Sequence, residues 1–181
     1  MSNKLSPIEQ PYPSEVAGIL AAYPQQDGYI LSLFRTFANS LRFLKKGVPN
    51  LLDKESPLPL RIREIVILRT TANKNCEYEW GVHVSIFARA AKLTPHQVAA
   101  TASKVVDPEN WSPVEARLIN VVDELCASGV ISEDALAGFE SDWTKEQQLE
   151  VLALVGTYHT ISFVANTARL QNEQFGASFP A

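Results

Sequence analysis

Cysteine and basic residues are both scarce in this chain of 181 residues. The two cysteines, Cys76 and Cys126, lie fifty positions apart, which excludes a disulfide scaffold and favours a reducing compartment. The 16 lysines and arginines are outnumbered by 20 acidic residues and form no basic stripe, so nucleic acid is not an expected partner. We therefore expect a cytoplasmic protein that does not bind nucleic acid.

Long hydrophobic segments are missing as well. The N-terminal residues lack the basic start, apolar stretch and small-residue cleavage site of a signal peptide. The longest apolar runs are too short or too interrupted to span a bilayer, so the sequence predicts no membrane partner. No segment alternates between apolar and polar residues over the length of a strand, which argues against a sheet.

Helical periodicity is present instead. Apolar residues recur at three- and four-residue steps, for example at Ile30, Leu33 and Phe37. Thr94 and Ser112 each precede a proline, which is typical of a capping residue before the first helical position. The expected helices lie at residues 14–23, 27–46, 60–72, 76–92, 112–127, 132–142 and 144–170, with a further one that begins at residue 94. The sequence thus predicts an all-α bundle of about seven or eight helices.

A single domain is expected to follow a short N-terminal arm. Residues 1–13 contain Pro7, Pro11 and Pro13 and have no steady apolar period, so we expect an extended arm, laid on a neighbouring subunit. Residues 14–181 are enough for one helical domain of ordinary size, and 46% of the chain is hydrophobic, which is sufficient for a real core.

Four residues in the middle of the chain form the candidate site. Cys76, Glu79 and His83 follow one another at i, i+3 and i+7, which places them on one face of a helix. Glu64 lies twelve positions before Cys76 in the preceding helix and is expected to reach the same pocket. A thiol, an imidazole and two carboxylates form a reactive set that a purely structural helix does not need.

Each member of the set suits a chemical role. Cys76, in the first turn of a helix, is expected to be nucleophilic near neutral pH, because the helix dipole favours a thiolate. His83 can transfer a proton near neutral pH, and Glu79 and Glu64 can orient it or act as the base. Taken singly, each residue also suits a structural role: a small buried hydrophobe for the cysteine, or a surface helix contact for the Glu–His pair.

Other polar residues are interpreted as structural. Cys126 is expected to lie in the core, and His159 to be a satisfied interior or interface histidine. Glu79 and His83 lack the partner residues of known zinc motifs, so we expect no metal and no cofactor.

The segment Arg63-Glu64-Ile65-Val66-Ile67-Leu68-Arg69, followed by Cys76 and His83, resembles the carboxymuconolactone decarboxylase family, which includes the alkylhydroperoxidase D-like proteins. Redox members of that family have a Glu, a Cys-x-x-Cys that begins twelve positions later, and a His four residues after the second cysteine. Glu64, Cys76 and His83 match, whereas Glu79 stands where those members have their second cysteine. The resemblance is strongest over about residues 55–100.

The resemblance implies an alkylhydroperoxidase D-like helical bundle that forms a homo-oligomer and acts on a small organic molecule. Since the second cysteine is absent, it favours acid–base chemistry through Glu79, His83 and Glu64, in the manner of the decarboxylase members. One alternative is a one-cysteine peroxidase, in which Cys76 attacks a peroxide and an outside thiol reduces the sulfenic acid. Another is a non-catalytic helical oligomer.

Overall fold

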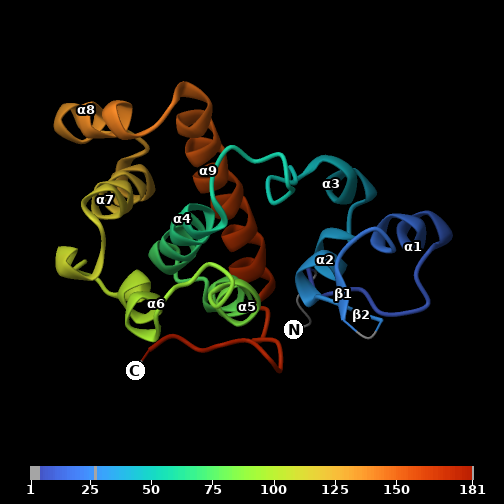
Figure 1. Cartoon of the computed structure of the whole chain (residues 1–181). Coiled ribbons are helices and arrows are strands. Elements are labelled where there is room, and N and C mark those ends of the chain that lie inside the picture. The colour runs from blue at the N-terminus through green and yellow to red at the C-terminus, as the bar shows by residue number, and fades with distance from the viewer. Residues whose placement is uncertain (1–4, 27, 181) are drawn as a thin grey trace.

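The computed structural model describes residues 5–26 and 28–180, and nine α-helices dominate that part of the chain (Figure 1). They are α1 (Ser14–Leu20), α2 (Ser32–Phe37), α3 (Leu41–Lys46), α4 (Leu60–Asn73), α5 (Glu77–Phe87), α6 (Pro95–Ala102), α7 (Pro113–Ser128), α8 (Glu133–Asp142) and α9 (Lys145–Ala168). The remaining described secondary structure is a short antiparallel hairpin and a 3-10 turn. The hairpin pairs the two-residue strands β1 (Gln25–Gln26) and β2 (Tyr29–Ile30), and the turn is η1 (Pro108–Asn110). The prediction of an all-α fold is confirmed.

The N-terminal region differs from the single helix expected over 27–46. Asp27 lies outside the described residues, and Gly28 has a positive φ of 79°, a conformation that glycine adopts readily, in the turn before β2. Helix α2 ends before Ser40, whose Oγ accepts a hydrogen bond at 3.2 Å from the backbone N–H of Phe43 and caps α3. This local cap divides the expected helix into two short ones.

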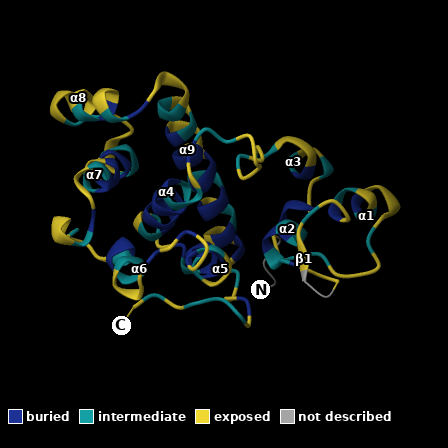
Figure 2. Cartoon of the chain, in the orientation of Figure 1, coloured by how far each residue is buried: buried dark blue, intermediate teal, exposed yellow. Residues whose placement is uncertain are grey.

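Helix α4 lies at the centre of the core, and α5, α6, α7 and α9 pack around it (Figure 2). Residues Ile65 to Leu68 of α4 have no solvent exposure, because neighbouring helices cover every face. Three capping boxes define where surrounding helices begin: Thr94 with Gln97, Ser112 with Glu115, and Thr144 with Gln147. The central helix therefore holds some of its polar residues, such as Glu64 and Arg69, deep inside the protein.

Helix α9 is long and apolar enough, by length and composition alone, to cross a membrane, contrary to the expectation from its sequence. Half of its most apolar stretch is buried within the protein, and it packs against α2, α4 and α5. A core helix of a globular bundle has the same length and composition, and this packing accounts for its apolar character.

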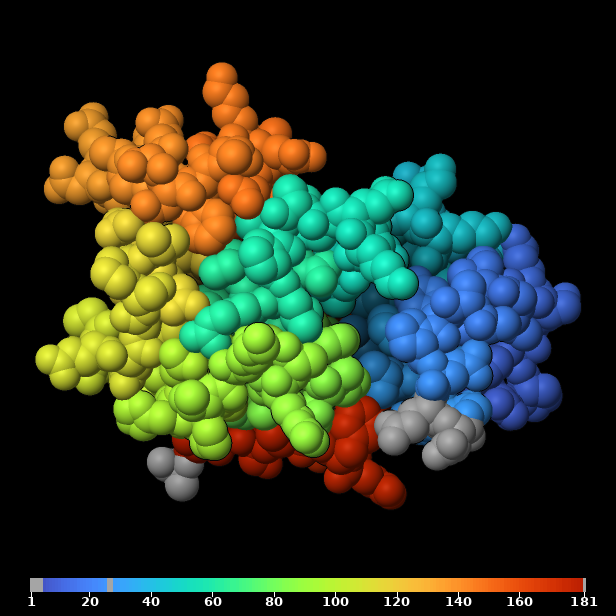
Figure 3. Space-filling model, viewed as in Figure 1, coloured from blue at the N-terminus to red at the C-terminus, as the bar shows by residue number. Residues whose placement is uncertain are grey.

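The N-terminal helices and the segment after α9 lie against the bundle. Helices α1 to α3 form a lobe on one side (Figure 3) and contact α9 through α2. Residues 5–13 of the expected arm contain no helix or strand, and the N–H of Ile8 donates to the carbonyl of Arg35 at 3.3 Å; residues 1–4 lie outside the described residues. After α9 the chain runs along α5, where the N–H of Ala177 donates to the carbonyl of Gly81 at 3.1 Å.

Candidate functional site

Glu64 and His83 are joined directly inside the core. Glu64 lies on α4 and is 1% exposed, and His83 lies on α5 and is 3% exposed. Nδ1 of His83 lies 2.8 Å from Oε2 of Glu64. This buried hydrogen bond fixes the orientation of the imidazole ring and leaves Nε2 to face the other side of the site.

The second ring nitrogen of His83 faces two oxygen atoms. Nε2 lies 3.0 Å from the hydroxyl of Tyr158, in the middle of α9, and 3.4 Å from Oε1 of Glu79. Glu79 lies one turn before His83 on α5, so the helical spacing brings both to one face, as the sequence predicts. Three helices thus bring together Glu64, Glu79, His83 and Tyr158, which we call the relay.

The charges in the relay determine where its protons reside. Burial lowers the pKa of His83, but the charges and hydrogen bonds of Glu64 and Glu79 outweigh burial and raise this pKa to about 10. His83 is therefore an imidazolium at neutral pH and donates from both ring nitrogens. Burial and the charges of Glu79 and Glu64 raise the pKa of Tyr158 well above its ordinary value, so the phenol keeps its proton.

Glu79 provides the free end of the relay. Its carboxylate is 5% exposed, and Oε1 faces His83, whereas Oε2 is buried with no hydrogen-bond partner among the described residues. Buried carboxylate oxygens normally have a partner, and leaving one without costs about 1–3 kcal/mol. Oε2 of Glu79 is therefore the atom of the relay that is poised to accept a proton from a molecule outside it.

Cys76 lies next to the relay, but its position in the helix and the pKa of its thiol differ from those predicted from the sequence. Asn75 has a left-handed φ of 51°, and Cys76 itself is the N-cap of α5. The thiol is fully buried, and burial raises its pKa to about 11, although the backbone N–H of Glu79 and the hydroxyl of Ser162 favour the thiolate. The prediction that Cys76 is a thiolate near neutral pH is therefore wrong, because desolvation outweighs the effect of the helix terminus.

Two polar residues near this site were not predicted from the sequence. Tyr158 and Ser162 lie four residues apart on α9, and both are buried in the face that meets α5. The spacing of a tyrosine and a serine one turn apart, on one face of α9, was the available signal. The neighbouring His159 does not join the relay, because its Nδ1 lies 2.8 Å from the carbonyl of Val155 on the same helix.

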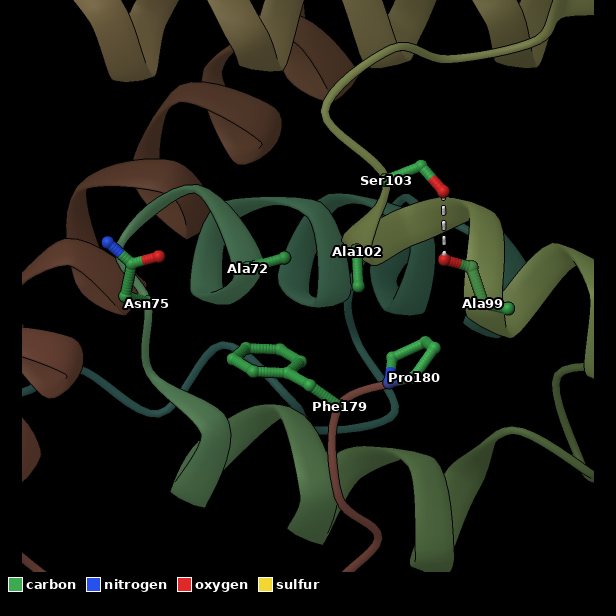
Figure 4. A pocket seen from close by; sticks show the side chains of 7 residues that line it. All are labelled: Ala72, Asn75, Ala99, Ala102, Ser103, Phe179 and Pro180. Atoms are coloured by element: carbon green, nitrogen blue, oxygen red, sulfur yellow. Dashed lines mark hydrogen bonds between the residues drawn. The ribbon is translucent and has the colours of Figure 1, made fainter.

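Two cavities lie between α6 and the C-terminal segment, and neither is lined by a relay residue. One, of about 340 Å³, is closed on one side by the C-terminal residues Phe179 and Pro180 (Figure 4) and is also lined by Ala72, Asn75, Ala99, Ala102 and Ser103. The other, of about 560 Å³, lies between Trp80, Leu93 and the C-terminal segment. The relay is thus enclosed by the helices of this chain.

The site has little capacity for a metal ion. Within residues 5–26 and 28–180, no group of three His, Cys, Asp or Glu side chains has the arrangement of a metal site. His83 uses one ring nitrogen for Glu64 and the other for Tyr158 and Glu79, so neither is free to act as a ligand.

The sequence matches the model of the carboxymuconolactone decarboxylase family over residues 44–124, a segment that contains α4, α5 and α6 and three of the four relay residues. No curated protein matches the sequence.

Solved structures with the same fold include proteins of related description. The debrominase Bmp8, in a variant with a cysteine replaced by alanine and bound to 2,3,4-tribromopyrrole, has a TM-score of 0.78 at 12% identity over 97% of this chain and 94% of its own. An uncharacterized peroxidase-related protein from Silicibacter sp. TM1040 has a TM-score of 0.76 at 16% identity, over 93% and 90% of the chains. ATU0492 from Agrobacterium tumefaciens, a protein of unknown function whose name links it to the antioxidant defence protein AhpD, has a TM-score of 0.60 at 19% identity, over 66% and 82%. These likenesses show a shared AhpD-like helical fold.

Proposed function

We propose that this chain, whose residues 44–124 match the model of the carboxymuconolactone decarboxylase family, is an enzyme that performs acid–base chemistry on a small organic molecule. One observation supports this most: His83 contacts Glu64 through one ring nitrogen and faces Glu79 and Tyr158 through the other, all inside the core. Buried carboxylates around one imidazole are an arrangement that acid–base catalysis uses.

Each relay residue has a distinct role in this proposal. Glu64 holds and orients His83, whose positive charge in turn stabilises the carboxylate of Glu79. Oε2 of Glu79 exchanges the proton with the substrate, since it is the relay oxygen without a partner among the described residues. The hydroxyl of Tyr158 contacts Nε2 of His83 and further restricts the orientation of the imidazole ring. Because every relay residue is at most 5% exposed, the substrate reaches Glu79 only when the surrounding side chains move.

A small carboxylated lactone is the substrate class that the family description suggests. In a decarboxylation, the bond between the substrate carbon and its carboxylate breaks, carbon dioxide leaves, and the electron pair stays on the carbon. Oε2 of Glu79, a carboxylate at rest, takes a proton from solvent and passes it to that carbon, which completes the product and returns Glu79 to the carboxylate. The net reaction consumes one proton and needs no thiol.

Release of carbon dioxide from carboxylated lactones tests this proposal. We expect Glu79→Gln to lower kcat by about 10²- to 10⁴-fold, as for other general acid–base residues, and Cys76→Ser to retain the activity. Loss of activity in Cys76→Ser with full activity in Glu79→Gln would contradict the acid–base assignment.

A one-cysteine peroxidase is the second candidate, and two groups beside Cys76 favour it, although burial of the thiol opposes it. The backbone N–H of Glu79 and the hydroxyl of Ser162 both favour a thiolate at Cys76. In this reaction the thiolate attacks the terminal oxygen of a hydroperoxide, the oxygen–oxygen bond breaks, an alcohol leaves, and Cys76 becomes a sulfenic acid that an external thiol reduces.

Glu79→Cys tests this second candidate, because it restores the Cys-x-x-Cys spacing of the redox members. The variant should form an internal disulfide on treatment with peroxide and gain turnover driven by a dithiol. The wild-type protein should show little dithiol-driven turnover. Strong dithiol-driven turnover by the original chain, unchanged in Cys126→Ser, would favour thiol chemistry over acid–base chemistry.

A further inference from the structure

Arg63 differs from the other arginines that are partly or fully buried in the described residues. Arg35, Arg61 and Arg69 each form an ion pair, with N–O distances of 2.6, 2.6 and 2.5 Å to Glu9, Glu115 and Asp123. Arg63 pairs with no carboxylate of the described residues, although it is only partly exposed. A partly buried guanidinium usually has an anionic partner, because removing its charge from water is costly.

The contacts of Arg63 leave much of its hydrogen-bonding capacity unused. One terminal nitrogen donates to the backbone carbonyl of Asp53 at 2.9 Å, and the buried Nε–H has no partner among the described residues. The carboxylates of Asp53, whose backbone Arg63 contacts, and of Glu64, the next residue in the chain, each bind another group. Oδ1 of Asp53 accepts from the N–H of Glu55 at 2.9 Å, and Oε2 of Glu64 contacts His83.

Arg63 also lies beside the relay. It directly precedes Glu64 on α4, and its positive charge acts on Tyr158, where it opposes the burial and the Glu79 and Glu64 charges that raise the pKa of the phenol. Tyr158 in turn contacts Nε2 of His83. A cation without an anionic partner among the described residues is thus held next to the groups that would transfer the proton.

We propose that Arg63 is a substrate-binding residue that receives a carboxylate, so that the enzyme prefers small organic anions over neutral molecules of the same shape. The planar guanidinium, with its Nε–H and terminal N–H groups, matches the two oxygens of a carboxylate. The substrate carboxylate supplies the anionic partner that Arg63 lacks within residues 5–26 and 28–180. This inference rests on the proposed function, since it names the substrate class of the same site.

A pair of matched ligands tests the proposal without depending on turnover. A γ-butyrolactone carboxylate and its carboxamide have nearly the same shape and differ in charge. We expect the original chain to bind the carboxylate about tenfold or more tightly than the carboxamide in calorimetric titration, since a charge-assisted pair has that strength. This preference should fall to near unity in Arg63→Gln and be partly retained in Arg63→Lys.

Arg61→Gln is the matched control, because Arg61 lies two residues earlier on the same helix and already pairs with Glu115. It should lower thermal stability and leave the preference for the carboxylate unchanged. Equal binding of both ligands by the original chain, no saturable binding of either, or an unchanged preference in Arg63→Gln and Arg63→Lys would each overturn the role of Arg63.

Measuring turnover as well as binding distinguishes a failure of the Arg63 inference from a failure of the proposed function. A strong preference for the carboxylate that depends on Arg63, without release of carbon dioxide from any carboxylated lactone, would support Arg63 as the anion site and contradict decarboxylation. Turnover that depends on Glu79, combined with a carboxylate preference that is indifferent to Arg63, would support the acid–base relay and overturn the anion site.

Discussion

At the scale of single residues, burial determines the chemistry of both cysteines. Cys76 is fully buried and burial raises its pKa to about 11, whereas Cys126 is partly exposed. Burial also raises the pKa of Cys126 overall, although the Asn73 side chain and the Lys74 charge oppose this rise. We therefore expect iodoacetamide to label Cys126 faster than Cys76 in the native protein, as measured by peptide mapping after brief treatment.

The unfolded protein is the control for this measurement. In denaturant both thiols should react at similar rates, because the difference arises from the fold. Faster labelling of Cys76 in the native protein would show that its thiol is accessible and would strengthen the peroxidase candidate.

The raised pKa of His83 has a consequence for stability. An imidazolium held at a pKa of about 10 in the folded protein, against roughly 6.5 when unfolded, stabilises the fold fully below about pH 6.5. That contribution is lost as the pH rises through about 10. Urea unfolding between pH 6 and pH 10 should show a decline in the free energy of unfolding that is steeper in the original chain than in His83→Gln. Equal slopes would mean that His83 is neutral when folded.

At the scale of elements, Gly81 allows the C-terminal segment to lie on α5. A Cβ at this position would overlap the carbonyl oxygen of Ala177, whose N–H bonds to the carbonyl of Gly81. Gly81→Ala should therefore displace residues 171–180 from the helix without unfolding α5. The expected result is faster proteolysis of the C-terminal segment, followed by mass spectrometry of the products.

Gly156 on α9 is the matched control for this substitution. It is exposed, and a Cβ there would meet no atom within 4 Å. Gly156→Ala should leave the C-terminal segment in place and stabilise the protein by about 0.5–1 kcal/mol, because alanine favours the helix over glycine. Similar proteolysis of both variants would argue against the close contact at Gly81.

At the scale of the whole molecule, one buried arginine joins three elements. Arg69 on α4 is 3% exposed and binds Asp123 on α7 through two contacts, of 2.5 and 2.8 Å. It also donates to the carbonyls of Thr101 and Ser103 at the end of α6, at 3.0 and 2.6 Å. The charge pair and the two carbonyls together fix α6 and α7 against the central helix.

Asp123→Ala should destabilise the protein by about 3–5 kcal/mol, because the guanidinium of Arg69 then stays buried without its anion. Denaturant titration measures this effect. The pair of Arg117 with Asp142 is the control, because its guanidinium is exposed whereas that of Arg69 is buried, and Asp142→Ala should have a much smaller effect. Comparable losses in the two variants would contradict the importance of burial.

The expected homo-oligomer stays a prediction at this scale. Leu149, Leu152 and Phe163 remain exposed on α9, and their spacing places them along one side of the helix. We expect this side to contact a second copy of the chain. Phe163→Glu should then lower the mass measured by light scattering, and a monomeric original chain would contradict the expectation.

The sequence by itself determined the helical class and most helix boundaries, and it predicted that Glu64, Glu79 and His83 lie together. Periodicity and capping residues act within a few positions of one another, so Thr94, Ser112 and Thr144 begin helices in the structure as predicted. The spacing between Glu79 and His83 likewise placed both side chains on one face of α5, since that depends only on helical geometry.

Only the tertiary structure decided how these residues act. Tyr158 joins the relay from a helix more than seventy positions away, which no local pattern encodes. Cys76 stays protonated because the surrounding helices remove it from water, and desolvation is a property of the whole packed core. Whether Arg63 finds an anion within the chain also depended on where distant carboxylates lie, and among the described residues they lie elsewhere.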